Sequence, residues 1–250
     1  MTSAADDGER LAELAANLAA VRARIAMASE AAGRSPAEVT LIAVTKTFPA
    51  SDVMLLHQLG ISDIGENKDQ EAAPKVAACA AAGLALRWHF VGQLQVNKAA
   101  SVASYADMVH SVDRVRLAGA LGRRAVTAGR QVRCLVQVNL DSGSGPGSAT
   151  ASGAGRGGAD PGQVLEVAAA IAASDGLELA GVMAVAPLGQ PARPAYARLR
   201  EIAELVRAAY PPAQMISAGM SGDLVDAIAE GATHVRIGTA LLGGRRAFVR

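Results

Sequence analysis

The chain has 250 residues, of which 51% are hydrophobic and 3% aromatic, and its formal net charge at pH 7 is +1. This length is enough to bury a sizeable core, and it suits a single α/β barrel domain. The balanced charge offers no electrostatic basis for binding nucleic acid or an anionic membrane. The amino terminus lacks a basic-then-apolar signal pattern and no apolar run is long enough to cross a bilayer, so we expect a soluble cytoplasmic protein.

The first predicted element is a long amphipathic helix over about residues 7–32. Aliphatic side chains recur there at steps of three and four residues, at Leu11, Leu14, Leu18, Val21 and Ile25, which is the spacing of one helical face. Gly33 follows where a glycine commonly ends a helix.

After this helix the chain alternates between strand-like and helix-like segments. The predicted strands are residues 40–46, 63–66, 87–92, 107–113, 132–140, 177–186, 215–218 and 233–238. The predicted helices between them are residues 50–59, 69–82, 95–105, 114–129, 161–174, 193–209 and 221–230. Such alternation indicates βα units and a parallel sheet. Eight strands in one series favour a closed (β/α)8 TIM barrel over an open doubly wound sheet, so we expect an α/β protein in which residues 1–250 form one barrel domain with an extra N-terminal helix.

One segment interrupts the alternation. Residues 141–162 are dominated by Gly, Ser and Ala and show no apolar periodicity, so burial cannot offset the entropy cost of ordering them. The segment follows the fifth predicted strand, on the face of the barrel that carries function. We expect a flexible loop, which is either a mobile cover over a ligand mouth or a tolerated low-complexity insertion.

Lys46 is the first residue that suggests chemistry. It ends the apolar, β-branched run of the first predicted strand, and Pro49 follows shortly after it. A lone lysine is oddly placed there for a structural charge. It is well placed for an amine that reacts with an aldehyde, because a desolvated lysine loses its proton readily and forms Schiff bases.

The loops after the seventh and eighth predicted strands are the usual phosphate-binding loops of such barrels. They contain Ser217, Gly219 and Ser221 in one loop and Gly238 and Thr239 in the other. Glycines let a backbone approach an anion closely, and hydroxyl and N–H groups can then cradle it. Ser221 is also a candidate N-cap of the helix predicted over 221–230. The alternative is that the glycines only form turns and Ser221 only caps.

Once the barrel closes, the first strand is a neighbour of the last two. A ligand that joins Lys46 to the phosphate loops needs an aldehyde and a phosphate, which describes pyridoxal 5′-phosphate (PLP). Arg236 lies between the two anchors and could donate to the pyridine nitrogen, if it does not form a salt bridge instead. Because arginine is effectively never neutral, it would keep that nitrogen unprotonated. The site is therefore expected to hold the cofactor better than it exploits it.

No metal site is expected. Cys79 and Cys134 lie far apart, form no CxxC motif, and are interpreted as reduced thiols. The four histidines show no metal-ligand spacing and are interpreted as hydrogen-bonded core or surface residues.

These motifs, taken in order, resemble those of the pyridoxal phosphate homeostasis proteins, which share the barrel of the alanine racemase amino-terminal domain. The matching segments are 43–46 (AVTK), 65–67 (GEN), 70–71 (QE), 88–98 (WHFVGQLQVNK), 110–114 (HSVDR), 137–139 (QVN), 181–183 (GVM), 217–221 (SAGMS) and 235–239 (VRIGT). The segment at 88–98 is a specific signature, and the ordered set is more specific than any one of its members.

The resemblance implies a role for each of these positions. Lys46 would carry the Schiff base, and the phosphate would be held by Ser217, Gly219, Ser221, Gly238 and Thr239. Arg236 would face the pyridine nitrogen, and Asn67 and Met183 would lie near the ring. The resemblance also implies a monomeric carrier for intracellular PLP homeostasis, with no catalytic residue and with PLP-dependent apo-enzymes as recipients.

Two enzyme hypotheses stay open beside this one. A PLP-dependent racemase-like enzyme would require an acid/base tyrosine from a second domain, whereas this chain ends just after its eighth predicted strand and its three tyrosines fall on predicted helices. A sugar-phosphate aldolase-like enzyme would require acids at strand ends, for which Glu66 and Asp113 are the candidates.

Overall fold

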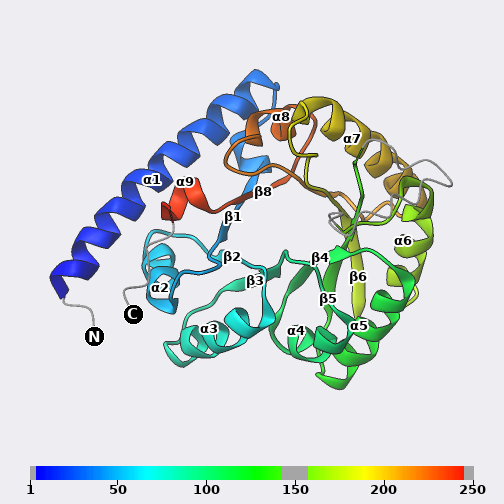
Figure 1. Ribbon diagram of the computed structural model, residues 1–250, viewed down its shortest axis with the longest axis horizontal. Coiled ribbons are helices and arrows are strands. Elements are labelled where there is room, and N and C mark those ends of the chain that lie inside the picture. Colours follow the sequence, from blue (N-terminus) through cyan, green and yellow to red (C-terminus); the bar gives the residue numbers. More distant parts are fainter. Residues whose placement is uncertain (1–3, 142–156, 245–250) are drawn as a thin grey trace.

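The computed structural model describes residues 4–141 and 157–244. Its eight parallel strands form a closed barrel in the order of the sequence, β1-β2-β3-β4-β5-β6-β7-β8 (Figure 1). The strands are β1 Thr40–Val44, β2 Asp63–Glu66, β3 Arg87–Phe90, β4 Met108–Val112, β5 Val132–Gln137, β6 Leu177–Met183, β7 Met215–Ser217 and β8 His234–Ile237. The predicted (β/α)8 barrel is confirmed, because β8 pairs with β1 and leaves no open edge.

Helices surround the barrel (Figure 1), and each of the described helices except α1 follows a strand. They are α1 Ala4–Ala31, α2 Ala50–Gln58, α3 Asp69–Ala81, α4 Ala99–Tyr105, α5 Val115–Thr127, α6 Val164–Ala172, α7 Ala192–Ala209, α8 Leu224–Ala229 and α9 Thr239–Leu242. Short 3-10 turns are Pro36–Glu38, Val96–Lys98 and Pro161–Gln163. The last two of these turns form the starts of the helices predicted from residues 95 and 161.

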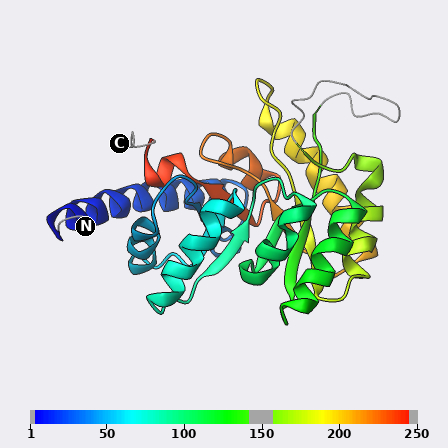
Figure 2. The ribbon, with the colours of Figure 1, turned by 60° about the horizontal axis from the view of Figure 1, so that its bottom comes forward.

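The extra N-terminal helix is present as α1. Its predicted apolar face is buried, including Leu14, Leu18 and Val21, and it packs against α8 and α9, beside which it runs in both views (Figure 1, Figure 2). Arg10 of this helix donates hydrogen bonds to Asp52 of α2 at 2.7 Å and to the carbonyl of Leu242 at 3.0 Å. The helix thereby joins the first and last helical parts of the barrel.

Several predicted strands end earlier than the apolar runs suggested. β1 stops at Val44, β5 at Gln137 and β6 at Met183. Past β1 the chain turns sharply, since Thr47 has a positive φ of 68°, a conformation that no strand contains. The apolar residues beyond these strand ends lie in loops on the carboxyl-terminal face of the barrel. Several of them, such as Val138 and Ala184, are buried although they belong to no strand.

The predicted loop over residues 141–162 lies mostly outside the described residues, which omit 142–156. The two sides of this gap are paired with each other. Ala159 forms a parallel bridge with Val138, donates to the carbonyl of Gln137 at 2.8 Å and accepts from the N–H of Asn139 at 2.9 Å. In the described parts of the chain, no helix is both long and apolar enough to cross a membrane.

Candidate functional site

A cleft of about 680 Å³ opens at the carboxyl-terminal ends of the strands. It is lined by Val44, Lys46, Thr47, Phe48, Asn67, Val91, Gly92, Val185, Met220, Ser221, Gly222, Arg236, Gly238, Thr239, Gly243 and Gly244. The cleft therefore brings together Lys46, Arg236 and both predicted phosphate loops, as the sequence led us to expect. Ser217, Gly219 and Met183 are not among its lining residues.

Lys46 enters the cleft from the end of β1. Ile42 of β1 pairs with Arg236 of β8, so Lys46 lies just beyond the point where the first and last strands meet. The side chain is exposed, and of the four lysines in the chain it is the one with no salt bridge to a described residue. The other three are paired, at Lys68, Lys75 and Lys98. An amine without a carboxylate partner is available to a carbonyl ligand.

A buried ion pair supports the backbone beside Lys46. Lys75 of α3 pairs with Glu66 of β2 and donates to the carbonyl of Thr45 at 2.8 Å. The Thr45 hydroxyl also donates to Glu66, at 2.5 Å. Burial raises the pKa of the Glu66 carboxyl, although the charge of Lys75 opposes this shift. Glu66 does not line the cleft, so it is poorly placed as the acid of an aldolase-like enzyme.

The expected phosphate end of the cleft is the start of α9. Gly238 is the N-cap of this short helix, and the first N–H groups of a helix have no acceptor within it. The Ser221 hydroxyl accepts from one of them, that of Ala240, at 3.2 Å. A side chain added at Gly238 would place its Cβ 3.3 Å from the carbonyl oxygen of Val44. This end thus presents N–H and hydroxyl groups of the type that bind anions.

The prediction that Ser221 caps the helix after β7 is wrong. α8 begins at Leu224, and its N-cap residue is Asp223. The Asp223 carboxylate accepts from the N–H of Met220 at 2.6 Å, which folds the intervening residues into a turn. Ser221 lies inside that turn and points its hydroxyl at α9 instead.

Three predicted site residues lie beneath the cleft. Ser217 is fully buried, and its hydroxyl bonds to Arg236 and His110. Gly219 has a positive φ of 91°, and an added Cβ would lie 2.7 Å from that of Ala227, so this position requires glycine to let the turn pack on α8. Met183 is 1% exposed and belongs to an apolar cluster inside the barrel.

Arg236 is buried at the base of the cleft, with an exposure of 5%. It donates to the Ser217 hydroxyl at 2.7 Å and to the carbonyl of Ala184 at 2.8 Å. Burial lowers the pKa of its guanidinium. No carboxylate of the described residues forms a salt bridge with it, so the salt-bridge alternative is not observed.

Asn67 provides an unpaired acceptor at the cleft wall. Its side-chain oxygen is buried and has no partner among the described residues, an arrangement that is costly unless a ligand or water supplies a donor. Gly92 packs directly on this residue, because an added Cβ would lie 2.0 Å from the Asn67 carbonyl oxygen. The sequence motif at 88–98 contains Gly92, but its contact with Asn67 depends on barrel closure and was not foreseen.

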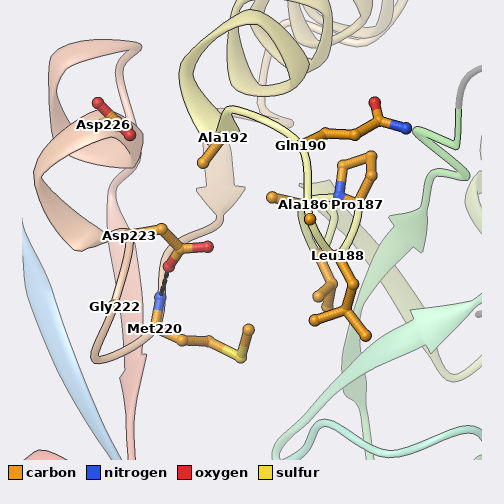
Figure 3. A pocket seen from close by; sticks show the side chains of 11 residues that line it. Ala186, Pro187, Leu188, Gln190, Ala192, Met220, Gly222, Asp223 and Asp226 are labelled. Carbon is orange, nitrogen blue, oxygen red and sulfur yellow. Dashed lines mark hydrogen bonds between the residues drawn. The ribbon is translucent and has the colours of Figure 1, made fainter.

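A second pocket, of about 540 Å³, adjoins the cleft. It lies between the loops that follow β6 and β7 and shares Val185, Met220 and Gly222 with the cleft. Figure 3 shows the Met220 side chain extending toward Leu188, and a dashed line marks the bond from the Met220 N–H to the Asp223 carboxylate. Met220 is therefore one of the residues that line both spaces.

Comparisons with known proteins give consistent results. Residues 16–246 match the family model described as the alanine racemase N-terminal domain. The chain is 45% identical to the pyridoxal phosphate homeostasis protein of Mycobacterium tuberculosis, over 95% of both chains. It is 37% identical to that of Escherichia coli K12, over 93% of this chain and 97% of the relative.

Solved structures show the same barrel. PipY of Synechococcus elongatus, determined with PLP bound, superposes with a TM-score of 0.77 and 32% identity over 92% of this chain and all of PipY. Alanine racemase of Corynebacterium glutamicum superposes with a TM-score of 0.65, but at 16% identity and over 60% of that enzyme's chain. The second likeness concerns the fold alone. The names of the more similar proteins describe homeostasis of a cofactor and not a reaction.

Proposed function

Because the chain belongs to the pyridoxal phosphate homeostasis protein family, we propose that it binds PLP and holds it as a Schiff base on Lys46. The observation that carries this proposal is the shared cleft: Lys46, Arg236 and the start of α9 all line it. The PLP bound to PipY supports the same identity for the ligand.

The residues present fit this cofactor. The start of α9 with Ser221 offers N–H and hydroxyl groups to a phosphate, and Lys46 offers a free amine to an aldehyde. Arg236 would face the ring nitrogen, and the unpaired oxygen of Asn67 would accept from a polar group near the ring. When bound, PLP would supply an electrophilic carbonyl and an aromatic electron sink.

The lining of the cleft favours holding the cofactor over using it in catalysis. Of the described residues that line it, only Lys46 and Arg236 are charged, and none is His, Cys, Tyr, Asp or Glu. A racemase requires a second proton-transfer group opposite its lysine. The tyrosines are not there: Tyr196 donates to Asp223 at 2.8 Å, Tyr105 lies against Asp69, and Tyr210 ends α7. The protein would therefore bind PLP without turning over an amino acid.

The proposal extends to delivery of the cofactor. Lys46 is exposed, so a Schiff base at this position stays open to exchange with water or with another amine. Such exchange is what a monomeric carrier needs in order to release PLP to PLP-dependent apo-enzymes. We include this transfer in the proposed function.

Borohydride trapping tests the proposal. The protein is incubated with PLP, reduced, and its intact mass is measured before and after reduction, followed by peptide mapping. We expect one added pyridoxyl phosphate group, on Lys46, and no addition to Lys46→Ala. Lys68→Ala removes a highly exposed lysine next to Asn67 and serves as the matched control, which should be labelled like the parent. Equal labelling of Lys46→Ala and the parent would refute the proposal.

A further inference from the structure

A chain of hydrogen bonds crosses the inside of the barrel beneath the cleft. Its first part joins Arg236 of β8 to the Ser217 hydroxyl of β7, at 2.7 Å, and Ser217 to Nδ1 of His110 on β4, at 2.9 Å. Its second part joins Nε2 of His110 to Nδ1 of His89 on β3, at 3.0 Å. Nε2 of His89 then meets the carboxylate of Asp63 on β2, at 3.0 Å. Residues of five strands thus connect the cofactor face of the barrel with its opposite end.

The residues at the two ends of this series of hydrogen bonds, Arg236 and Asp63, determine which atom donates in each bond. Arginine can only donate hydrogen bonds, and an ionised carboxylate can only accept them. If each link carries one proton, Ser217 accepts from Arg236 and donates to His110, His110 donates to His89, and His89 donates to Asp63. Both histidines are then neutral, with the proton on Nε2 and with Nδ1 as acceptor.

The opposite direction leaves a buried donor unpaired. A protonated His89 would donate to both Asp63 and His110, and His110 would then donate from Nδ1 to Ser217. The Ser217 hydroxyl would accept from two sides, and no other acceptor for its own proton is found among the described residues. Ser217 is fully buried, so that unpaired proton would cost free energy.

Surrounding charges fix the two features that both directions share, a neutral His110 and an ionised Asp63, so the Ser217 proton is what distinguishes the two directions. Burial, together with the charge of Arg236, lowers the pKa of His110 well below its ordinary value, which keeps that ring neutral. Although burial opposes it, hydrogen bonds from His89 and Arg87 lower the pKa of the Asp63 carboxyl. Arg87 donates to this carboxylate at 2.7 and 2.5 Å, so the accepting end of the chain stays ionised.

We propose that His110 and His89 are positioning residues, held as neutral Nε2–H tautomers, which orient the Ser217 hydroxyl and through it the guanidinium of Arg236. With one nitrogen held by Ser217 and another by the Ala184 carbonyl, the plane of the guanidinium is fixed. The consequence for the cofactor, a fixed donor toward the ring nitrogen, rests on the proposed function. On this view Ser217 acts on PLP through Arg236 and does not touch the phosphate.

Nitrogen NMR tests the tautomers without any cofactor. The full chain is labelled with 15N-histidine, and long-range 1H–15N correlations are recorded at pH 7. The chain has four histidines. The variants His57→Gln and His234→Gln each remove one signal, and the two signals that remain in both variants belong to His89 and His110. We expect protonated Nε2 and unprotonated Nδ1 in both His89 and His110. An Nδ1–H tautomer of His110, or a doubly protonated His89, would overturn the proposal.

Ligand binding tests the link to Arg236. Ser217→Ala should weaken PLP and unphosphorylated pyridoxal by the same factor, about tenfold. His110→Phe should do likewise, and circular dichroism verifies that it folds. His234→Phe is the matched control, because His234 bonds to Thr233 outside the chain of contacts, and it should bind PLP like the parent. A loss confined to the phosphorylated ligand in Ser217→Ala would place Ser217 on the phosphate and overturn the positioning role. If the parent bound neither ligand, the proposed function would fail while the NMR result still decided the tautomers.

Discussion

Ile42 and Arg236 are direct partners in the β1–β8 ladder, so the closing seam of the barrel is also the base of the candidate site. Lys46 extends from one side of this seam, and the α9 helix begins on the other. Residues that are far apart in the chain therefore form one cleft only because the barrel closes. Predictions about ligand binding, stability and pH follow from this arrangement.

The start of α9 and Ser221 should recognise phosphate specifically. We expect Ser221→Ala and Thr239→Val each to weaken PLP binding about three- to tenfold, because each removes a hydroxyl at the proposed phosphate end of the cleft. Binding of pyridoxal, which lacks the phosphate, should be unchanged. Absorbance titration with both ligands measures the difference. Ser104→Ala, on the exposed surface of α4, is the control. An equal loss for both ligands would contradict a phosphate site here.

The buried pair of Glu66 and Lys75 should be important for stability. Lys75→Met leaves the Glu66 carboxylate buried without its charge partner, so we expect the free energy of unfolding to fall by about 3–5 kcal/mol. Urea denaturation measures this change. Adding Glu66→Gln to Lys75→Met should recover part of the loss, since the remaining side chain is neutral.

Lys98→Met provides the comparison for Lys75→Met. Lys98 forms a partly exposed ion pair with Asp69 at 3.7 Å, and such pairs contribute only about 0–1 kcal/mol. If the two lysine variants lost the same stability, the special role assigned to the buried pair would be wrong.

Gly219 and Gly222 form a matched pair in the turn after β7. Gly219→Ala should destabilise the protein by about 1–3 kcal/mol, because the position has a positive φ and an added Cβ would meet Ala227 and Leu224. Nothing lies within 4 Å of a Cβ added at Gly222, so Gly222→Ala should change stability by less than about 0.5 kcal/mol. Thermal or urea unfolding of both variants measures the difference in stability. If Gly219→Ala were as stable as the parent, the turn would tolerate a side chain and the prediction would be wrong.

Acid should destabilise the protein through His110, which is buried, and His234, which is half-buried. Burial, the largest cause, lowers the pKa of His234 to about 4 and that of His110 well below the ordinary value. The unfolded chain takes up these protons near pH 6.5, whereas the folded protein does so only at lower pH. The free energy of unfolding should therefore decrease as the pH falls from about 6.5 toward 4, and His234→Gln should reduce this slope.

Other groups do not obscure the pH test. The lowered pKa of Asp63 means that its stabilisation is present above the ordinary aspartate range and is lost only at lower pH. The raised pKa of Glu66 acts in the opposite sense, since protonation then favours the folded state. Both contributions cancel when the parent is compared with His234→Gln by urea denaturation at pH 7, 6 and 5. Identical slopes in the two proteins would contradict the role given to His234.

Local sequence patterns were sufficient where local physics decides the outcome. The alternation of apolar runs with amphipathic segments predicted all eight strands, because burial in a parallel barrel requires continuous apolar side chains. The predicted ends of the strands were less accurate after Val44 and Met183. The loop residues that directly follow there are buried too, so burial does not distinguish them from a strand. Ser221 was misassigned for a similar reason: a serine near a helix start resembles a cap, and only the bond between Asp223 and the Met220 N–H shows where α8 begins.

The sequence by itself determined the barrel, the position of the candidate amine Lys46 at the end of the first strand, and the two glycine-rich loops, since each depends on the spacing of residues close together in the chain. Only the tertiary structure decided which of those residues reach the cleft, since Ser217 and Met183 turn inward while Asn67 lines its wall. Only the tertiary structure revealed the series of hydrogen bonds that connects Arg236 to Asp63 through three other side chains. The five residues come from five strands, and they meet only after the sheet has closed on itself.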